Sequence, residues 1–259
     1  MAFFVDKHSI VRSIWGKGDT ILFIFAGASA EFALNKAVDW LYFTGRLPAD
    51  PLGRLFSTVA YARRIIFSDY EGALQAIDKI TSIHKSVEGN RGAEIPDWAY
   101  RDVLFMLIDY SIRSYELLER KLTDTEKLEI FNVFKRVGQR MQITDLPEDY
   151  TDWLSARTLH LEKNLIYSKF TADLYQQYKK HLGPFRYLLL KQAQVLVAPQ
   201  KVKTLLSLGN VRFLLPAVQI YKLTRLMKLE RILKNVILPK NYKKQIEDLD
   251  VEDTQLSKS

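Results

Sequence analysis

Two polar side chains interrupt an otherwise apolar segment, "DPLGRLFSTVAYARRIIFSD" at residues 50–69. Arg54 and Thr58 are four residues apart, so a helix places both side chains on one face. In one interpretation, Arg54 extends into solvent and Thr58 hydrogen-bonds to the carbonyl four residues earlier. In the other, both line a cavity, where Arg54 binds an anion or polarises a bound oxygen species and Thr58 supplies a hydroxyl donor. The spacing alone favours the first interpretation.

A histidine lies on an apolar helical face in the next segment. His84 follows Ile77, Ile80 and Ile83 and precedes Val87, all at helical spacing. In one interpretation, which is the commoner case for a lone histidine, the ring is buried and hydrogen-bonded among the isoleucines. In the other, the imidazole is an axial ligand of a haem iron, because one neutral imidazole in an apolar cavity is enough to hold it.

The rest of the sequence excludes several other kinds of chemistry. The chain has no cysteine, which excludes disulfides, thiolate metal sites and cysteine nucleophiles. The four histidines, at positions 8, 84, 160 and 181, are not spaced as in the zinc motif H-E-x-x-H. There is no G-x-S-x-G, P-loop or G-x-G-x-x-G motif, so hydrolase and nucleotide-binding signatures are absent.

Helical patterns cover nearly all of the 259 residues. Prolines and glycines fall at the ends of these segments, which is typical of helices and not of a β-sandwich. Asp50 as N-cap and Pro51 at the first helical position mark one start clearly. We expect an all-α domain of about ten helices. The expected helices are at about 19–43, 51–67, 68–87, 97–119, 124–141, 149–182, 184–197, 199–208 and 211–237, with a loop at 88–97.

Two further helix starts carry the pattern of a capping box, in which the first residue and the residue three positions later satisfy each other's backbone N–H groups. Ser68 with Glu71 has this pattern, and so does Thr123 with Glu126. We therefore expect Ser68 to cap the helix 68–87 and Thr123 to cap the helix 124–141.

Charge is distributed unevenly along the chain, whose net charge is +8. Residues 185–244 contain thirteen Lys or Arg and one acid, whereas residues 241–259 are mostly acidic and polar. We expect one domain at 1–240 and a disordered tail at 241–259. The basic segment fits either core helices with a solvated basic face, which we favour, or helices lying on an anionic membrane surface. It lacks a nucleic-acid recognition motif and aromatic platforms, so we expect no nucleic-acid partner.

The N-terminal residues lack the charged and apolar regions of a signal peptide. The most apolar run, residues 20–34, is interrupted by Glu31 and is shorter than the ~20 residues that a spanning helix needs. We expect a cytoplasmic protein, with association to a membrane surface left open.

The order of the motifs resembles the family that contains the ER-bound oxygenase MpaB and the latex-clearing rubber oxygenases. The elements that carry the resemblance, over about residues 10–200, are Asp50-Pro51, Arg54, Thr58, Phe67-Ser68-Asp69, Ala76, Ile80, His84, Val87, Gly89, Tyr115-Glu116, Leu122-Thr123, Glu126 and Leu146-Pro147. Some positions depart from the family pattern. "AGASAEF" stands where the first long helix often has His-Pro, and Ser57 stands where rubber oxygenases can carry a second axial lysine.

The resemblance implies a single globin-reminiscent helical domain that encloses haem b. It implies that His84 ligates the iron, that Arg54 and Thr58 line the haem pocket, and that O2 oxidises an apolar, isoprenoid or lipid-like substrate. Two hypotheses follow. One is a haem-dependent oxygenase in which Arg54 and Thr58 act on bound oxygen by hydrogen bonding. The other is a non-enzymatic helical protein that binds haem or associates with membranes through its basic C-terminal region.

Overall fold

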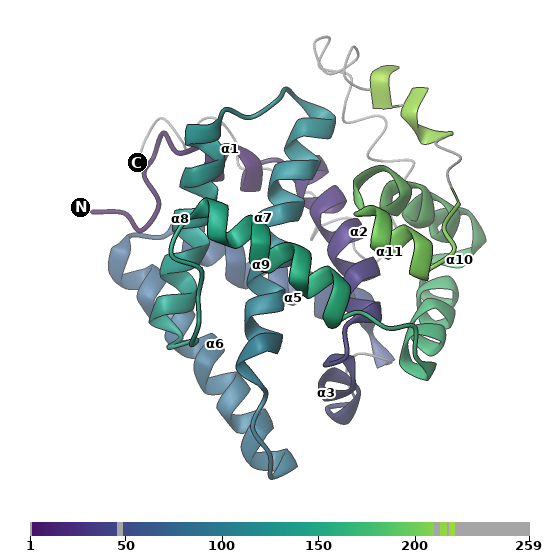
Figure 1. Ribbon diagram of the computed structural model, residues 1–259, viewed down its shortest axis with the longest axis horizontal. Helices are drawn as coiled ribbons and strands as arrows, with labels where there is room; N and C mark the ends of the chain where they lie inside the picture. The colour runs from purple at the N-terminus through teal and green to yellow at the C-terminus, as the bar shows by residue number, and fades with distance from the viewer. Residues whose placement is uncertain (1, 46–48, 210–212, 217, 221–259) are drawn as a thin grey trace.

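Helices form the regular structure of the protein in the computed structural model, which describes residues 2–45, 49–209, 213–216 and 218–220 (Figure 1). Within these ranges there is no strand, so the expected all-α class is confirmed. The helices with defined bounds are α1 Ile10–Trp15, α2 Gly18–Leu34, α3 Val38–Phe43, α5 Pro51–Phe67, α6 Tyr70–Arg91, α7 Asp97–Leu118, α8 Asp124–Arg140, α9 Tyr150–Lys163, α10 Lys169–Val197 and α11 Gln200–Leu205.

The centre of the fold is α2, which packs against α7 on one side and α10 on the other (Figure 1). Small residues make the contact with α7 close. A Cβ atom added at Gly27 of α2 would lie 2.2 Å from two ring carbons of Tyr110 in α7. Tyr110 is fully buried, and so is Ile24 one turn earlier in α2. The small residues in "AGASA" therefore let an aromatic ring of α7 lie directly against the backbone of α2.

The expected helix at 19–43 is wrong in one respect, because it is broken at residues 35–37 into α2 and α3. Asn35 takes an extended conformation, and its side-chain oxygen accepts a 2.8 Å hydrogen bond from the Ala37 N–H. Its amide nitrogen donates to Asp102 of α7, 2.8 Å away. A side chain that satisfies local backbone groups competes with the helix, and here a contact 67 residues away in the sequence holds it in place.

The start of α5 is as expected. The Asp50 side chain accepts a 2.8 Å hydrogen bond from the Gly53 N–H, and Pro51 is the first helical residue.

The expected cap of the next helix is wrong: α6 begins at Tyr70, and Asp69, not Ser68, is its N-cap. Ser68 instead ends α5, because its N–H donates to the Arg64 carbonyl.

The helix α6 also extends beyond the expected end at 87 and reaches Arg91. It ends at Gly92, whose φ of 70° lies in the left-handed region that glycine adopts without strain. The capping box at Thr123 and Glu126 is confirmed: each side chain accepts a hydrogen bond from the other residue's backbone N–H, at 3.2 and 2.8 Å.

The segment expected as a broken helix at 149–182 contains α9 and the first half of α10, joined by a loop. The second half of α10 continues after a kink at Gly183, where φ is 72° and ψ is 169°. The expected tail at 241–259, and most of the expected helix at 211–237, lie outside the described residues. Among the described helices, none has the length and apolar character needed to cross a membrane.

Candidate functional site

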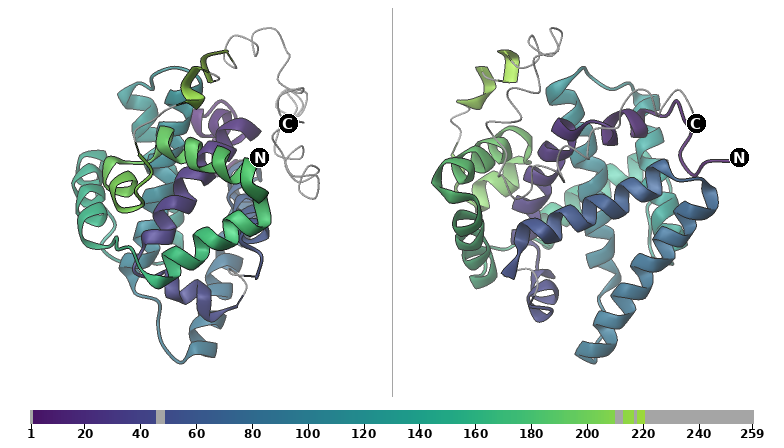
Figure 2. Two further views of the ribbon diagram at one scale, coloured as in Figure 1. Left: turned by 90° about the vertical axis from the view of Figure 1, so that its right-hand side faces the viewer. Right: turned by 180° about the vertical axis from the view of Figure 1, so that it is seen from behind.

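The residues singled out by the sequence lie on two consecutive helices that diverge from a short turn. The turn at Ser68 and Asp69 joins α5 to α6, and the two helices then separate like the arms of a V (Figure 2). Arg54 is thirteen residues before the end of α5 and His84 is fourteen residues after the start of α6, so both stand about 20 Å from the turn at 1.5 Å per residue. Arg54 on α5 and His84 on α6 are therefore at similar distances from the turn. We call the two helices the α5 arm and the α6 arm.

The α5 arm carries Thr58 half-buried, next to the fully buried Val59. Arg54 lies in the first turns of α5, and its side chain lies outside the described residues. The cap formed by Asp50 fixes where the helix begins, and so sets the positions of both residues on it.

On the α6 arm, His84 is half-buried and its Nδ1 atom is buried. The imidazole packs against the ring of Tyr100 in α7, with 5.1 Å between ring centroids and 55° between ring planes. This contact was not expected from the sequence.

Tyr100 is itself held in position from α6. Its hydroxyl donates a 2.9 Å hydrogen bond to Oε1 of Glu88, and the same oxygen accepts the Ile95 N–H at 2.9 Å. Burial, and then the hydrogen bond to Glu88, raise the pKa of Tyr100. The phenol therefore remains a donor over the physiological range, and its ring gives the imidazole of His84 a fixed surface.

The end of α6 is fastened to α3. Arg91 donates a 2.7 Å hydrogen bond to Asp39, and its guanidinium lies 3.9 Å from the ring centroid of Trp40 and 5.5 Å from that of Phe43. Cation–π contacts of this kind hold an arginine flat over the ring. Together with Tyr100 they place three aromatic side chains around the last turns of α6.

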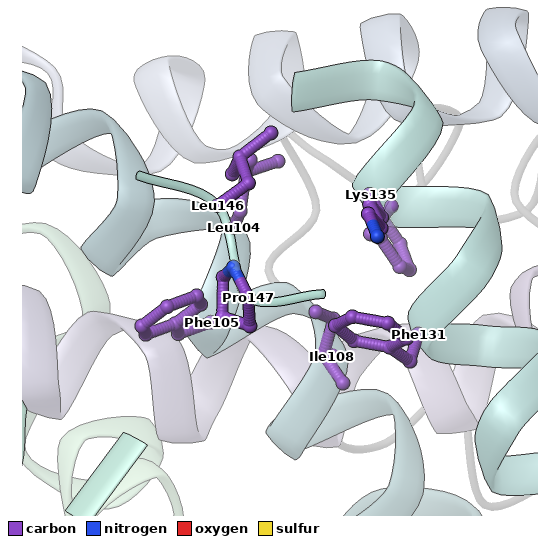
Figure 3. A pocket seen from close by; sticks show the side chains of 8 residues that line it. Leu104, Phe105, Ile108, Phe131, Lys135, Leu146 and Pro147 are labelled. Atoms are coloured by element: carbon purple, nitrogen blue, oxygen red, sulfur yellow. The ribbon is translucent and has the colours of Figure 1, made fainter. Parts of the chain in front are cut away.

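A separate pocket lies between α7 and α8 (Figure 3). Its cavity volume is about 10 Å³, and it is lined by Leu104, Phe105, Ile108, Phe131, Phe134, Lys135, Leu146 and Pro147. None of the three residues singled out by the sequence lines it. That volume holds about one water molecule and is far below the ~300–1,000 Å³ of typical ligand pockets, so we do not assign the pocket to the cofactor.

The most highly charged part of the interior was missed by the sequence analysis. Glu31 of α2 is fully buried, and both of its carboxylate oxygens accept hydrogen bonds from the guanidinium of Arg157 in α9, one of them at 2.7 Å. The Arg157 guanidinium also donates to Asp109 of α7 at 2.9 and 3.1 Å. The Tyr110 hydroxyl donates to Glu31 at 2.8 Å.

His160, one helical turn after Arg157, extends this cluster. Its Nε2 lies 2.9 Å from Oε1 of Glu31, and its Nδ1 lies 2.8 Å from Oδ1 of Asp102. Asp102 also accepts hydrogen bonds from the amide of Asn164, at 2.9 and 3.1 Å. We call Glu31, Asp102, Asp109, Arg157 and His160 the buried charge cluster.

The pKa values follow from these contacts. For Glu31, burial favours the neutral acid, but the charge of Arg157 and the hydrogen bonds from Arg157 and His160 outweigh it and lower the pKa to about 2. For His160, burial favours the neutral ring, but the hydrogen bonds to Asp102 and Glu31 outweigh it and raise the pKa. Glu31 is therefore ionised at neutral pH, and the contacts of the cluster join α2, α7 and α9.

One signal in the sequence pointed toward this cluster. Glu31 is the one acid in the apolar run at 20–34, and a charged side chain in such a run is buried only with a partner. The identity of that partner was not readable, because Arg157 is 126 residues away. Among the described residues, no group of three or more His, Asp or Glu side chains is arranged to hold a metal ion.

Comparison with known proteins gives one match. The chain matches the family model described as "ER-bound oxygenase mpaB/B'/Rubber oxygenase, catalytic domain" over residues 15–229, which is most of its length. No curated protein and no solved structure matches the chain. The matched range contains α5, α6, α7 and the buried charge cluster.

Proposed function

Because the chain belongs to the family of MpaB and rubber oxygenase catalytic domains, we propose that it is a haem b-dependent oxygenase that oxidises an apolar, isoprenoid or lipid-like substrate with O2. When bound, haem supplies the iron-centred activation of O2. The protein supplies the iron ligand, the polar groups around it and a dry environment. The single observation that carries the proposal is the half-buried imidazole of His84 on the α6 arm, opposite Arg54 on the α5 arm.

The residues present fit a haem ligated by one histidine. In this proposal the imidazole of His84 is the iron ligand, and the ring of Tyr100 supports it through their contact at 5.1 Å. The apolar face that leads to His84 begins with the fully buried Ile77. A porphyrin is a flat, apolar ring with a polar edge, and an aliphatic helix face with neighbouring aromatic rings is a suitable wall for it.

Arg54 and Thr58 have separate roles in the proposal. Arg54 binds an anionic group at the edge of the cofactor, because a guanidinium forms strong paired hydrogen bonds with a carboxylate. Thr58 would supply a small hydroxyl donor to the haem pocket, and a fixed donor of this kind stabilises charge as it develops. Both residues are set by the same capped helix start.

Oxygen uptake by the haem-loaded, full-length protein tests this function. Squalene represents an isoprenoid substrate and linoleic acid an unsaturated lipid. We expect substrate-dependent O2 consumption in the wild type, none with His84→Ala, and a reduced rate with Thr58→Val. His181→Ala is the matched control, because His181 is an exposed histidine on α10; its rate should equal that of the wild type.

The second candidate is a haem-binding protein without oxygenase activity. One observation favours it: Ser57 stands where rubber oxygenases can carry a lysine as second axial ligand. A haem-loaded protein that consumes no O2 with either substrate, while His84→Ala loses the haem, would select this candidate over the oxygenase.

A further inference from the structure

The second half of α10 has an exposed apolar face that the proposed function does not use. The kink at Gly183 redirects the helix, and Pro184 follows it. Phe185 is 59% exposed and Leu188 is 46% exposed. They are three residues apart, so they lie on the same face of the helix. Two large apolar side chains are thus presented to solvent side by side.

The same half-helix is firmly attached to the protein on its other face. The Gln194 side chain accepts a 3.0 Å hydrogen bond from the Tyr175 hydroxyl and lies 3.3 Å from Oγ of Ser29 in α2. Val195 and Val197 are buried. Phe185 and Leu188 are therefore carried on an anchored element, and their exposure does not come from a loosely attached helix.

The exposed charged residues that flank this half-helix in the sequence are basic. Between Asp173 and Glu230 the sequence contains no acidic residue, whereas it contains ten Lys or Arg. Of these, Lys179 and Lys180 are exposed just before the kink, and Lys201 is exposed at the start of α11. Figure 2 shows α10 and α11 together on one side of the molecule, the side that faces the viewer in the left panel.

We propose that this side docks the protein on an anionic membrane surface, with Phe185 and Leu188 inserted at the boundary between headgroups and acyl chains. Basic residues next to such a surface each contribute about 1 kcal/mol, and exposed apolar side chains add the free energy of their burial. A nucleic acid or an acidic protein would match the charge, but the phosphate backbone of a nucleic acid gains nothing from an exposed leucine. The combination of exposed apolar side chains with exposed cations therefore favours lipid.

Vesicle flotation with the full-length protein, without added haem, tests the docking surface separately from the oxygenase proposal. The vesicles are pure phosphatidylcholine or phosphatidylcholine with about 30% phosphatidylserine, at low and high salt. We expect binding to the anionic vesicles alone, weakened by salt because the charges are exposed. Phe185→Ser with Leu188→Ser should weaken that binding about tenfold or more, as the loss of two buried apolar side chains implies.

Two further variants make the test specific. Lys179→Glu with Lys180→Glu should also weaken binding to anionic vesicles. The matched control is Leu128→Ser with Leu154→Ser, which removes two exposed leucines, 41% and 48% exposed, from α8 and α9; it should bind as the wild type does. Equal binding to both kinds of vesicle, or unchanged binding by Phe185→Ser with Leu188→Ser, would overturn the proposal. Binding to polynucleotide with no binding to vesicles would overturn it in favour of a nucleic-acid surface.

Discussion

Replacing Arg157 with methionine tests whether the buried charge cluster holds the helices together. The change keeps much of the side-chain volume and removes the cation that donates to both Glu31 and Asp109. Arg157 and Glu31 have side chains that are 5% and 0% exposed. Removing one partner of a buried ion pair costs about 3–5 kcal/mol, because it leaves an uncompensated charge in the interior. That is a large part of the ~5–15 kcal/mol that stabilises a typical protein.

The assay is urea-induced unfolding, followed by circular dichroism at pH 8 and at pH 5. The free energy of unfolding of Arg157→Met should fall by about 3–5 kcal/mol at pH 8. The loss should be smaller at pH 5, because without Arg157 the burial of Glu31 raises its pKa and the carboxyl group takes up a proton.

Arg140→Met is the matched control. Arg140 also makes a two-point contact with a carboxylate, that of Asp78, but both side chains are about half exposed. Exposed pairs are screened by water, so this variant should change stability little. If Arg157→Met is no less stable than Arg140→Met at pH 8, the cluster is not a structural element of the fold and the reasoning fails.

Three further predictions follow from single contacts. Gly27→Ala places a Cβ against the Tyr110 ring and should cost about 1–3 kcal/mol in urea unfolding; wild-type stability would show that α2 and α7 are not in close contact. His160→Gln should remove a pH dependence of the free energy of unfolding. In the wild type, the raised pKa of His160 contributes stability. That contribution is fully present below about pH 6.5 and is lost as the pH rises through the folded-state pKa. Stability curves of the two proteins that stay parallel from pH 6 to 9 would contradict this. Thr123→Ala should cost about 0.5–2 kcal/mol through loss of the capping box, with no loss expected for Thr158→Ala on the exposed side of α9.

Local signals in the sequence predicted much of the helical architecture. Asp50 with Pro51 and Thr123 with Glu126 mark true helix starts, because a cap is made within three or four residues and needs no distant partner. The error at Ser68 has a local cause too. Asp69 is an equally good cap one residue later, and the end of α5 already uses the backbone of Ser68.

The break after α2 and the buried charge cluster were not predictable in the same way. Asn35 interrupts the helix with a side chain that is held by Asp102, and Glu31 is paired with Arg157. Both contacts join residues far apart in the sequence, so periodicity and capping patterns carry no information about them. For the candidate site, the family resemblance pointed to His84, Arg54 and Thr58, whereas their spacing alone favoured ordinary structural roles. The contact of Tyr100 with His84 came from the structure, and the roles of the three residues stay predictions.

Titration of the full-length protein with haemin, followed by the Soret absorbance, tests most directly whether His84 binds the iron of haem b. We predict saturation at one haem per chain in the wild type and in His181→Ala. His84→Gly should show a displaced Soret band and weaker binding, and added imidazole should restore the wild-type spectrum by replacing the lost ligand. A His84→Gly variant with the spectrum and affinity of the wild type, or a wild type that binds no haem, would contradict the account.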